Sequence, residues 1–194
     1  KTQIRVNGVQ HTATEHYMNN YGYVPLWILV KVLSFGIVSE LFTILKPDDQ
    51  KEIAEIYGVS VEQLLVYLPI LANFRNLCAH EDIIYEHKTH KIIENTKYHE
   101  LLRIPRQDGE YIYGKDDLFA LIIILKFMLR EDDFTLLINE FAYEVNILEG
   151  KLNSISINKV LDASGFKKNF EEIASIDMYG NLKEKFFCRS FNSG

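Results

Sequence analysis

Two long apolar runs, residues 24–38 (VPLWILVKVLSFGIV) and 118–129 (LFALIIILKFML), constrain the fold of this chain more than any other feature. Each is interrupted by a lysine, Lys31 or Lys126, and is shorter than the roughly 20 apolar residues that a membrane-crossing helix needs. Each carries apolar residues nearly all round, which is typical of a helix buried inside a protein. We therefore expect two buried helices and no membrane span.

Composition and charge indicate a globular protein with one main domain. Of its 194 residues, 47% are hydrophobic and 25% are charged, which is enough apolar material for a single core. The formal net charge of −6 argues against a general nucleic-acid coat, because affinity for phosphate comes from clustered cations, but it allows a small basic site. Cys78 and Cys188 form no disulfide framework or zinc spacing, and no signal peptide is visible. A cytoplasmic location is expected.

Helix start and stop signals predict an all-α fold. Ser60 and Gln63 form a capping-box pattern, and Gly58 is expected to end the preceding helix. No alternation of period two is longer than EYIY, which argues against a sheet. We expect helices over residues 25–45, 46–58, 60–80, 115–130 and 132–150, one or two short helices over 156–176, and a long irregular connection over 81–115.

These elements divide the chain into three segments. Residues 1–20 are expected to be an N-terminal lead-in that is truncated, residues 21–150 the main helical domain, and residues 151–194 short C-terminal helices packed on that domain.

The stretch NFRNLCAH, residues 73–80, places Arg75, Asn76 and His80 in an otherwise apolar helical run. At about 100° per residue, Arg75 and His80 would point about 140° apart on a regular helix. A site that uses both therefore needs a helix end, a kink or a second chain.

Two interpretations of this stretch follow from the residues alone. In the structural one, Arg75 pairs with an acid such as Asp82 or Glu40, and His80 caps a helix end. In the chemical one, His80 is a general acid or base, and Arg75 with Asn76 holds the oxygens of a phosphoryl group. Such a set can cleave RNA without a metal, with the ribose 2′-hydroxyl as the nucleophile.

Beyond these residues, the chain resembles the AbiD/AbiF family of bacterial abortive-infection proteins over residues 20–150. The resemblance is carried by PLWILVKVLSFGIVSELF, IYG, FRNLCAH, YHELLRIP and YIYGKDDLFALIIILKFML. RNLCAH is similar to the R-x4-6-H motif of the HEPN superfamily. Members of the family carry an arginine in the pattern HxERLY, whereas this chain reads HEDIIY, with Ile83 in that place.

The resemblance implies a HEPN-like helical bundle with a long connection after the motif helix. It also implies a metal-independent RNA endonuclease of phage defence that leaves 2′,3′-cyclic phosphate ends and needs no cofactor. Arg75, Asn76 and His80 would be its catalytic residues, in a composite cleft of a homodimer, and an antitoxin or accessory RNA is a further expected partner. The alternative is a non-catalytic HEPN module that binds RNA or protein, such as the neutralising partner of a toxin.

Four further residues are candidates for contacts with RNA: Lys31, Asp82, Tyr85 and Lys88. Tyr85 can stack on a base and Lys88 can attract phosphate. Lys31 is unusual in an apolar helix, and it either pairs with an acid such as Glu40 or faces the cleft.

The histidines after the motif allow one more alternative. His80, His87 and His90 lie close to acidic residues and could form a metal cluster by residue type, but their spacing fits no zinc pattern, so no metal site is predicted. Cys78 and Trp27 are expected to be core residues.

Overall fold

The computed structural model describes residues 12–177, and over this range the fold is all-α apart from one short hairpin. The predicted fold class is thereby confirmed. The elements are α2 (Thr12–Tyr21), α3 (Leu26–Val32), α4 (Phe35–Thr43), α5 (Pro47–Ile56), α6 (Val61–Ala79), α7 (Lys97–Leu101), β1 (Arg106–Gln107), β2 (Glu110–Tyr111), α8 (Leu118–Met128), α9 (Glu131–Lys151), α10 (Ile157–Ala163) and the 3-10 helix η1 (Phe170–Ser175).

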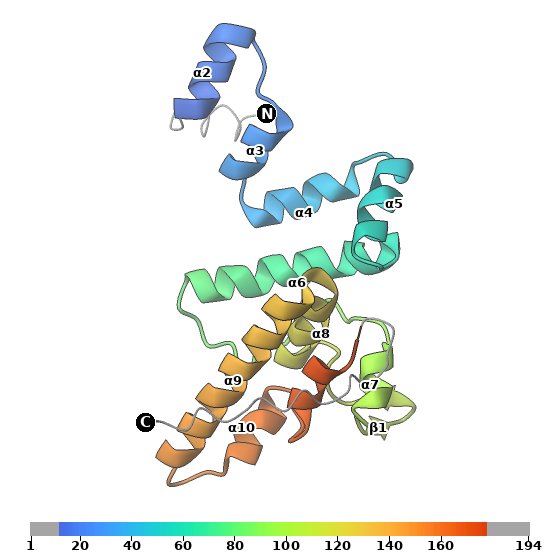
Figure 1. The fold of residues 1–194 in the computed structure, drawn as a ribbon, viewed down its shortest axis with the longest axis vertical. Helices are drawn as coiled ribbons and strands as arrows, with labels where there is room; N and C mark the ends of the chain where they lie inside the picture. Colours follow the sequence, from blue (N-terminus) through green and yellow to red (C-terminus); the bar gives the residue numbers. More distant parts are fainter. Residues whose placement is uncertain (1–11, 178–194) are drawn as a thin grey trace.

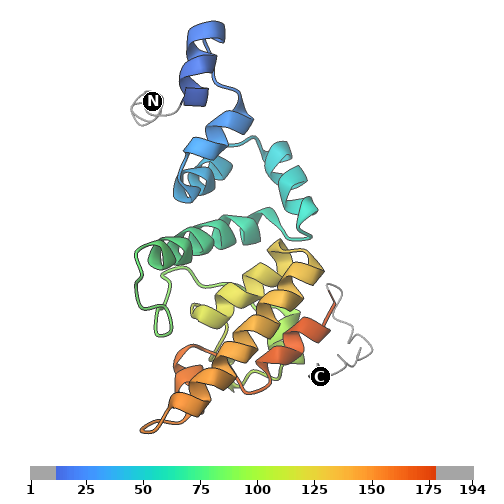
Figure 2. The same ribbon diagram turned by 60° about the vertical axis from the view of Figure 1, so that its left-hand side comes forward.

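The helices form an elongated molecule with a projecting N-terminal end. α6 runs across the middle, α4 and α5 lie on one side of it, and α7 to α10 form the body on the other side (Figure 1). α2 and α3 extend away from this body, and the same arrangement is visible after rotation (Figure 2). The N-terminal end therefore has little of the chain around it.

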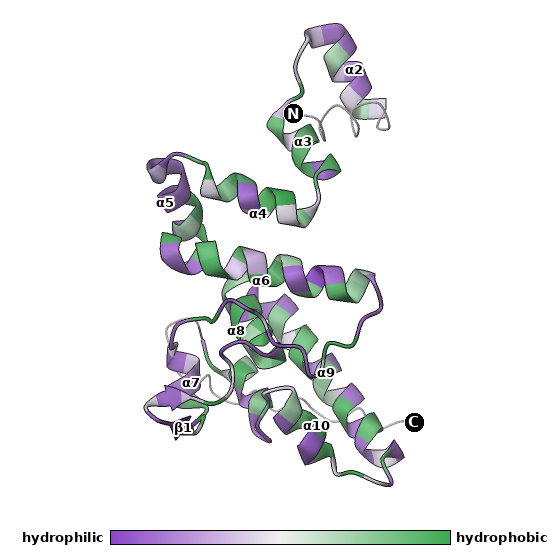
Figure 3. Cartoon of the chain, turned by 180° about the vertical axis from the view of Figure 1, so that it is seen from behind, coloured by the Kyte–Doolittle hydropathy of each residue, from purple (hydrophilic) through white to green (hydrophobic). Residues whose placement is uncertain are grey.

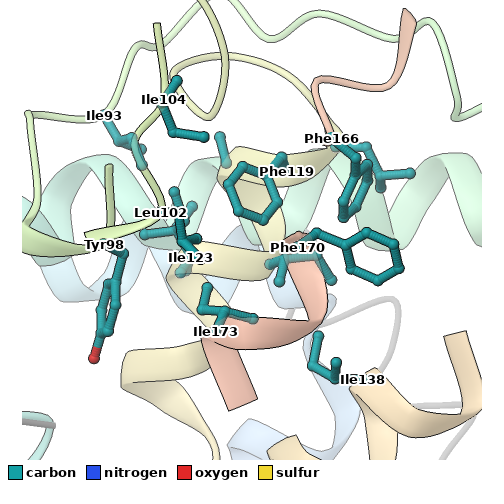
Figure 4. Close-up of a cluster of buried hydrophobic side chains, with 14 of the residues drawn as sticks. Ile93, Tyr98, Leu102, Ile104, Phe119, Ile123, Ile138, Phe166, Phe170 and Ile173 are labelled. Atoms are coloured by element: carbon teal, nitrogen blue, oxygen red, sulfur yellow. The ribbon is translucent and has the colours of Figure 1, made fainter. Parts of the chain in front are cut away.

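The main core lies between α6, α8, α9 and the C-terminal elements. α8 is buried along almost its whole length, as predicted for residues 118–129. Rings from three parts of the chain meet in this core, since Phe166 contacts Phe119, Phe141 and Phe170 with ring centroids 4.9–5.2 Å apart. Figure 4 shows Phe119 and Phe166 close to Phe170, which is the first residue of η1. Contacts among these rings join α8, α9 and η1 into one body.

The start and stop signals around α6 act as predicted. The Ser60 hydroxyl accepts a hydrogen bond from the Gln63 backbone amide, and the Gln63 side chain accepts one from the Ser60 amide, which completes the capping box. Gly58 has φ +62°, a conformation that glycine adopts without a steric penalty. The beginning of the motif helix is thus determined locally.

The expected helix over residues 25–45 is wrong, because the chain breaks it into α3 and α4. Leu33 is extended, and Ser34 starts α4 by accepting a hydrogen bond from the amide of Ile37. α3 is not central either: Trp27 is 58% exposed, which corrects its assignment to the core. The apolar residues on all sides of this segment predicted that it would be buried. The break at Leu33 and Ser34 instead directs α3 away from the body.

The expected irregular connection over residues 81–115 contains α7 and the β1–β2 hairpin, and it is held together by buried His99. The amide of Thr96 donates to His99 Nδ1 at 3.0 Å, and Nε2 lies 2.8 Å from the Gly114 carbonyl oxygen. Because a carbonyl only accepts, Nε2 carries the proton and Nδ1 does not. The ring also stacks on Tyr111, with centroids 4.9 Å apart. Burial lowers the pKa of His99, so the imidazole is neutral in the folded protein.

This arrangement predicts a loss of stability on acidification. In the unfolded chain His99 has an ordinary pKa of about 6.5 and binds a proton below that pH, whereas the folded protein binds this proton less readily. The free energy of unfolding therefore falls as the pH drops below about 6.5. A single proton limits the slope from this group to at most about 1.4 kcal/mol per pH unit. Denaturant unfolding between pH 7.5 and 5 measures it, and His99→Asn, which offers an acceptor but does not titrate, should flatten the curve. An equal slope in both proteins would contradict the assignment.

Within residues 12–177, no single helix combines the length and the apolar character of a membrane span. α5 and α6 meet that test only as a pair, across a bend of 73°.

Candidate functional site

The candidate site lies on the C-terminal half of α6. Phe74 is buried there and fixes the orientation of the helix on the core, while Arg75, Asn76 and His80 are all exposed. Cys78 is exposed as well, which corrects its assignment to the core. One face of this segment is therefore accessible to a ligand along its whole length.

Asn76 joins the other two motif residues. Arg75 Nη1 donates a hydrogen bond to Asn76 Oδ1 at 3.1 Å, and the His80 amide donates to the Asn76 backbone oxygen at 3.0 Å. Asn76 and His80, four positions apart, lie on one face of the helix. The long Arg75 side chain thus bends around α6 toward the face that carries His80, although no hydrogen bond joins Arg75 to His80 directly.

The ion-pair interpretation of Arg75 is not supported. Within the described part of the chain, Arg75 makes no salt bridge to Asp82 or Glu40, and its hydrogen-bond partner is a neutral amide. The other half of that interpretation is confirmed, because His80 is the C-terminal cap of α6. The guanidinium keeps most of its donors available to a phosphate.

The end of α6 is a Schellman turn with an unusual residue in its left-handed position. The amide of Asp82 bonds to the oxygen of Leu77, the amide of Glu81 bonds to the oxygen of Cys78, and Glu81 has φ +56°. Glycine normally occupies this position, and another residue costs about 1 kcal/mol. The turn stores strain directly beside His80.

Glu81→Gly is therefore expected to raise the free energy of unfolding by about 1 kcal/mol, because glycine adopts this conformation without a steric penalty. Urea denaturation measures the change. Glu86→Gly, at an exposed position with no positive φ, is the matched control and should not stabilise the protein. A Glu81→Gly protein no more stable than the wild type would show that the turn is not strained.

The structure adds two residues, Asn73 and His87, to the candidate site. His87 Nε2 lies 2.6 Å from Asn73 Oδ1, and the His87 ring meets the edge of Phe74 with centroids 5.3 Å apart. Asn73, Asn76 and His80 fall within about 60° on α6, so they form one polar stripe. The spacing of these three residues was a usable signal in the sequence, whereas the contact with His87 comes from the return of the connection over the helix.

Lys88 anchors that connection to the body. Its ammonium lies 3.0 Å from Asp116 Oδ1 and 3.4 Å from Asp117 Oδ2. Burial alone would lower the pKa of Lys88, but the two carboxylates outweigh it and raise the pKa. Asp117 is buried and caps α8 through the amide of Ala120, and burial raises its pKa despite these contacts. Lys88 is thus engaged in ion pairs rather than free in solution.

The other candidate RNA contacts are distributed unevenly. Asp82 and Tyr85 follow the motif directly and are exposed, and Tyr85 lines an apolar cavity of about 390 Å³ with residues of α9 and α10. Lys31 is exposed on α3 and forms no ion pair with Glu40 or any other described residue.

The alternative of a histidine metal cluster finds no support in this region. Across residues 12–177, no group of three or more His, Cys, Asp or Glu side chains is placed to hold a metal ion. His87, one member of that cluster, is directed at Asn73 instead.

No curated protein and no solved structure matches the chain. A family model described as Abi-like protein matches residues 1–86, less than half of the chain, and this stretch contains α2 to α6 and the whole motif. The match supports a relationship to an abortive-infection family.

Proposed function

We propose that this chain is a metal-independent RNA endonuclease of the HEPN type, acting in the cytoplasm as part of an abortive-infection defence against phage. The observation that carries the proposal is the Arg75–Asn76 hydrogen bond, which brings a guanidinium toward the exposed face of α6 that bears His80. The Abi-like match over residues 1–86 supports the biological setting.

The chemistry follows from these groups. His80 takes the proton of a ribose 2′-hydroxyl, the 2′-oxygen bonds to phosphorus, and the bond from phosphorus to the 5′-oxygen breaks. Arg75 and the Asn76 amide stabilise the charge on the non-bridging oxygens. A second acid gives a proton to the departing 5′-oxygen, and the products are a 2′,3′-cyclic phosphate and a 5′-hydroxyl.

A second copy of the chain completes this site. One motif supplies a single histidine, so two motifs that face each other would provide both a base and an acid around one phosphate. The proposed enzyme is therefore a homodimer with RNA in a composite cleft, and an antitoxin or accessory RNA would act by covering that cleft.

The test is cleavage of single-stranded RNA in excess chelator. Cleavage should persist in chelator, yield 2′,3′-cyclic ends, and stop at a site where a 2′-deoxynucleotide removes the nucleophile. Cleavage that needs an added divalent ion, or that proceeds at the deoxy position, would refute this mechanism.

A non-catalytic HEPN module that binds RNA or protein is the second candidate, and one observation favours it. Ile83 is 70% exposed where the related pattern has an arginine, so an apolar side chain stands where a phosphate contact is expected. Tight binding of the same RNA without any cleavage would support this candidate over the first.

A further inference from the structure

The N-terminal arm, defined here as α2 and α3 with their connection, exposes an unusual amount of apolar surface. Of the nineteen large hydrophobic side chains that are exposed in the described chain, six lie on this arm and a seventh, Phe35, follows it at the start of α4. Tyr21, Tyr23 and Trp27 are each about 60% exposed. The Tyr17 ring on α2 packs against the Trp27 ring on α3, with ring centroids 5.6 Å apart, and this contact holds α2 on α3. Soluble proteins rarely leave such a patch uncovered unless it is an interaction site.

A groove continues this surface toward the body. It has a volume of about 540 Å³, and its walls come from α3, α4, α5, α6 and α8. Leu26 and Val30 of the arm also line the groove, and so does Phe35, which is exposed at the start of α4. Figure 3 shows hydrophobic residues on α3, α4 and α6 around this region. The chain thus carries a projecting apolar arm and a concave apolar groove side by side.

We propose that the arm of one copy of this chain docks in the groove of a second copy, so that two chains exchange arms. In a two-fold dimer each chain both donates an arm and receives one, which requires the pairing of convex and concave surfaces seen here. This inference concerns assembly and does not depend on RNA cleavage.

The size of the surface favours a second copy as the occupant. Aromatic side chains bury roughly 150–250 Å² each when they go from full exposure to full burial. The seven side chains, four of them aromatic, are only 36–62% exposed, so covering what remains removes on the order of 600 Å² per chain from water. A stable interface needs about 800 Å² per partner, and the groove walls contribute part of the remainder.

Charge favours the same occupant. Residues 12–35 contain one acid, Glu15, and one base, Lys31, in a chain whose formal net charge is −6. An identical arm is therefore not repelled, and few charges lose water on contact. The near absence of cations also makes the arm a poor surface for RNA.

The test begins with light scattering across the micromolar range. The wild-type chain should be a dimer, and Trp27→Ser should weaken the dimer by at least about 30-fold. Tyr143→Ser is the matched control, because Tyr143 is 65% exposed on α9 and should leave the dimer unchanged. Trp27 is the only tryptophan, so its emission should also shift to shorter wavelength as the wild-type protein associates.

A mixing experiment separates arm exchange from other contacts. Val38→Glu places a charge in the groove and should also give a monomer, with circular dichroism confirming that both variants are folded. Mixing the Trp27→Ser and Val38→Glu proteins should restore a heterodimer, because one intact arm then meets one intact groove. A strict monomer in the wild type, a Trp27→Ser protein as dimeric as the wild type, or no rescue on mixing would each overturn the proposal. The RNA cleavage assay is scored separately, so failure of either proposal is recognisable.

Discussion

Replacing His80 with alanine is expected to lower the rate of RNA cleavage by about 10²- to 10⁴-fold, which is the usual contribution of a general acid or base. His80 ends α6 as an exposed cap, so its loss should leave the fold intact. Single-turnover cleavage of a labelled RNA measures the rate, and circular dichroism checks the helix content.

Arg75 provides the matched comparison. Arg75→Ala should be nearly as damaging as His80→Ala, whereas Arg75→Lys should retain part of the activity because it keeps the charge and loses the planar fork of donors. His90→Ala is the control, since this exposed histidine lies in the following connection and outside the polar stripe of α6. If His80→Ala and Arg75→Ala both keep full activity, the motif residues are not catalytic and the mechanism is wrong.

Gly165→Ala is expected to destabilise the fold by about 3 to 5 kcal/mol. Gly165 has φ +81°, and a Cβ atom at this position would overlap the side-chain carboxylate of Asp117. That carboxylate accepts from the amides of Gly114 and Ala120 and pairs with Lys88, so a methyl group there would displace a buried capping residue and leave polar groups unpaired. Denaturant unfolding measures the loss.

Gly150→Ala is the control for this prediction, and it is expected to change the free energy of unfolding in the opposite direction. Gly150 lies within α9, and a Cβ atom at this position would contact nothing within 4 Å. Alanine should therefore stabilise α9 by about 0.5 to 1 kcal/mol, because glycine loses more backbone freedom in a helix. If both substitutions destabilise the protein equally, the steric argument at Gly165 fails.

Elements determined by nearby residues could be predicted from the sequence. The capping box at Ser60, the stop at Gly58 and the buried run over residues 118–129 are all observed. Each depends on hydrogen bonds or conformational preferences within a few positions, and such preferences act in the same way in almost any context.

Predictions about burial failed where burial depends on the path of the chain in three dimensions. Trp27 and Cys78 are exposed, although their neighbours in the sequence are apolar. Hydrophobic residues indicate that a surface can be covered, but not whether the same chain covers it. The break at Leu33 and Ser34 directs α3 outward, and no local pattern revealed that direction.

The candidate site divides in the same way. By itself the sequence determined the presence of Arg75, Asn76 and His80, their angular spacing on one helix, and the capping role of the histidine, because helix geometry depends only on position along the chain. Tertiary structure alone decided that Arg75 bonds to Asn76 rather than to an acid, and that the connection returns to place His87 on Asn73. It also decided that Lys88 joins Asp116 and Asp117, 28 and 29 positions away. Contacts between residues so far apart in the sequence depend on how the whole core packs. The sequence offers many acidic residues as partners for Lys88, and only the folded structure determines which of them lie beside it.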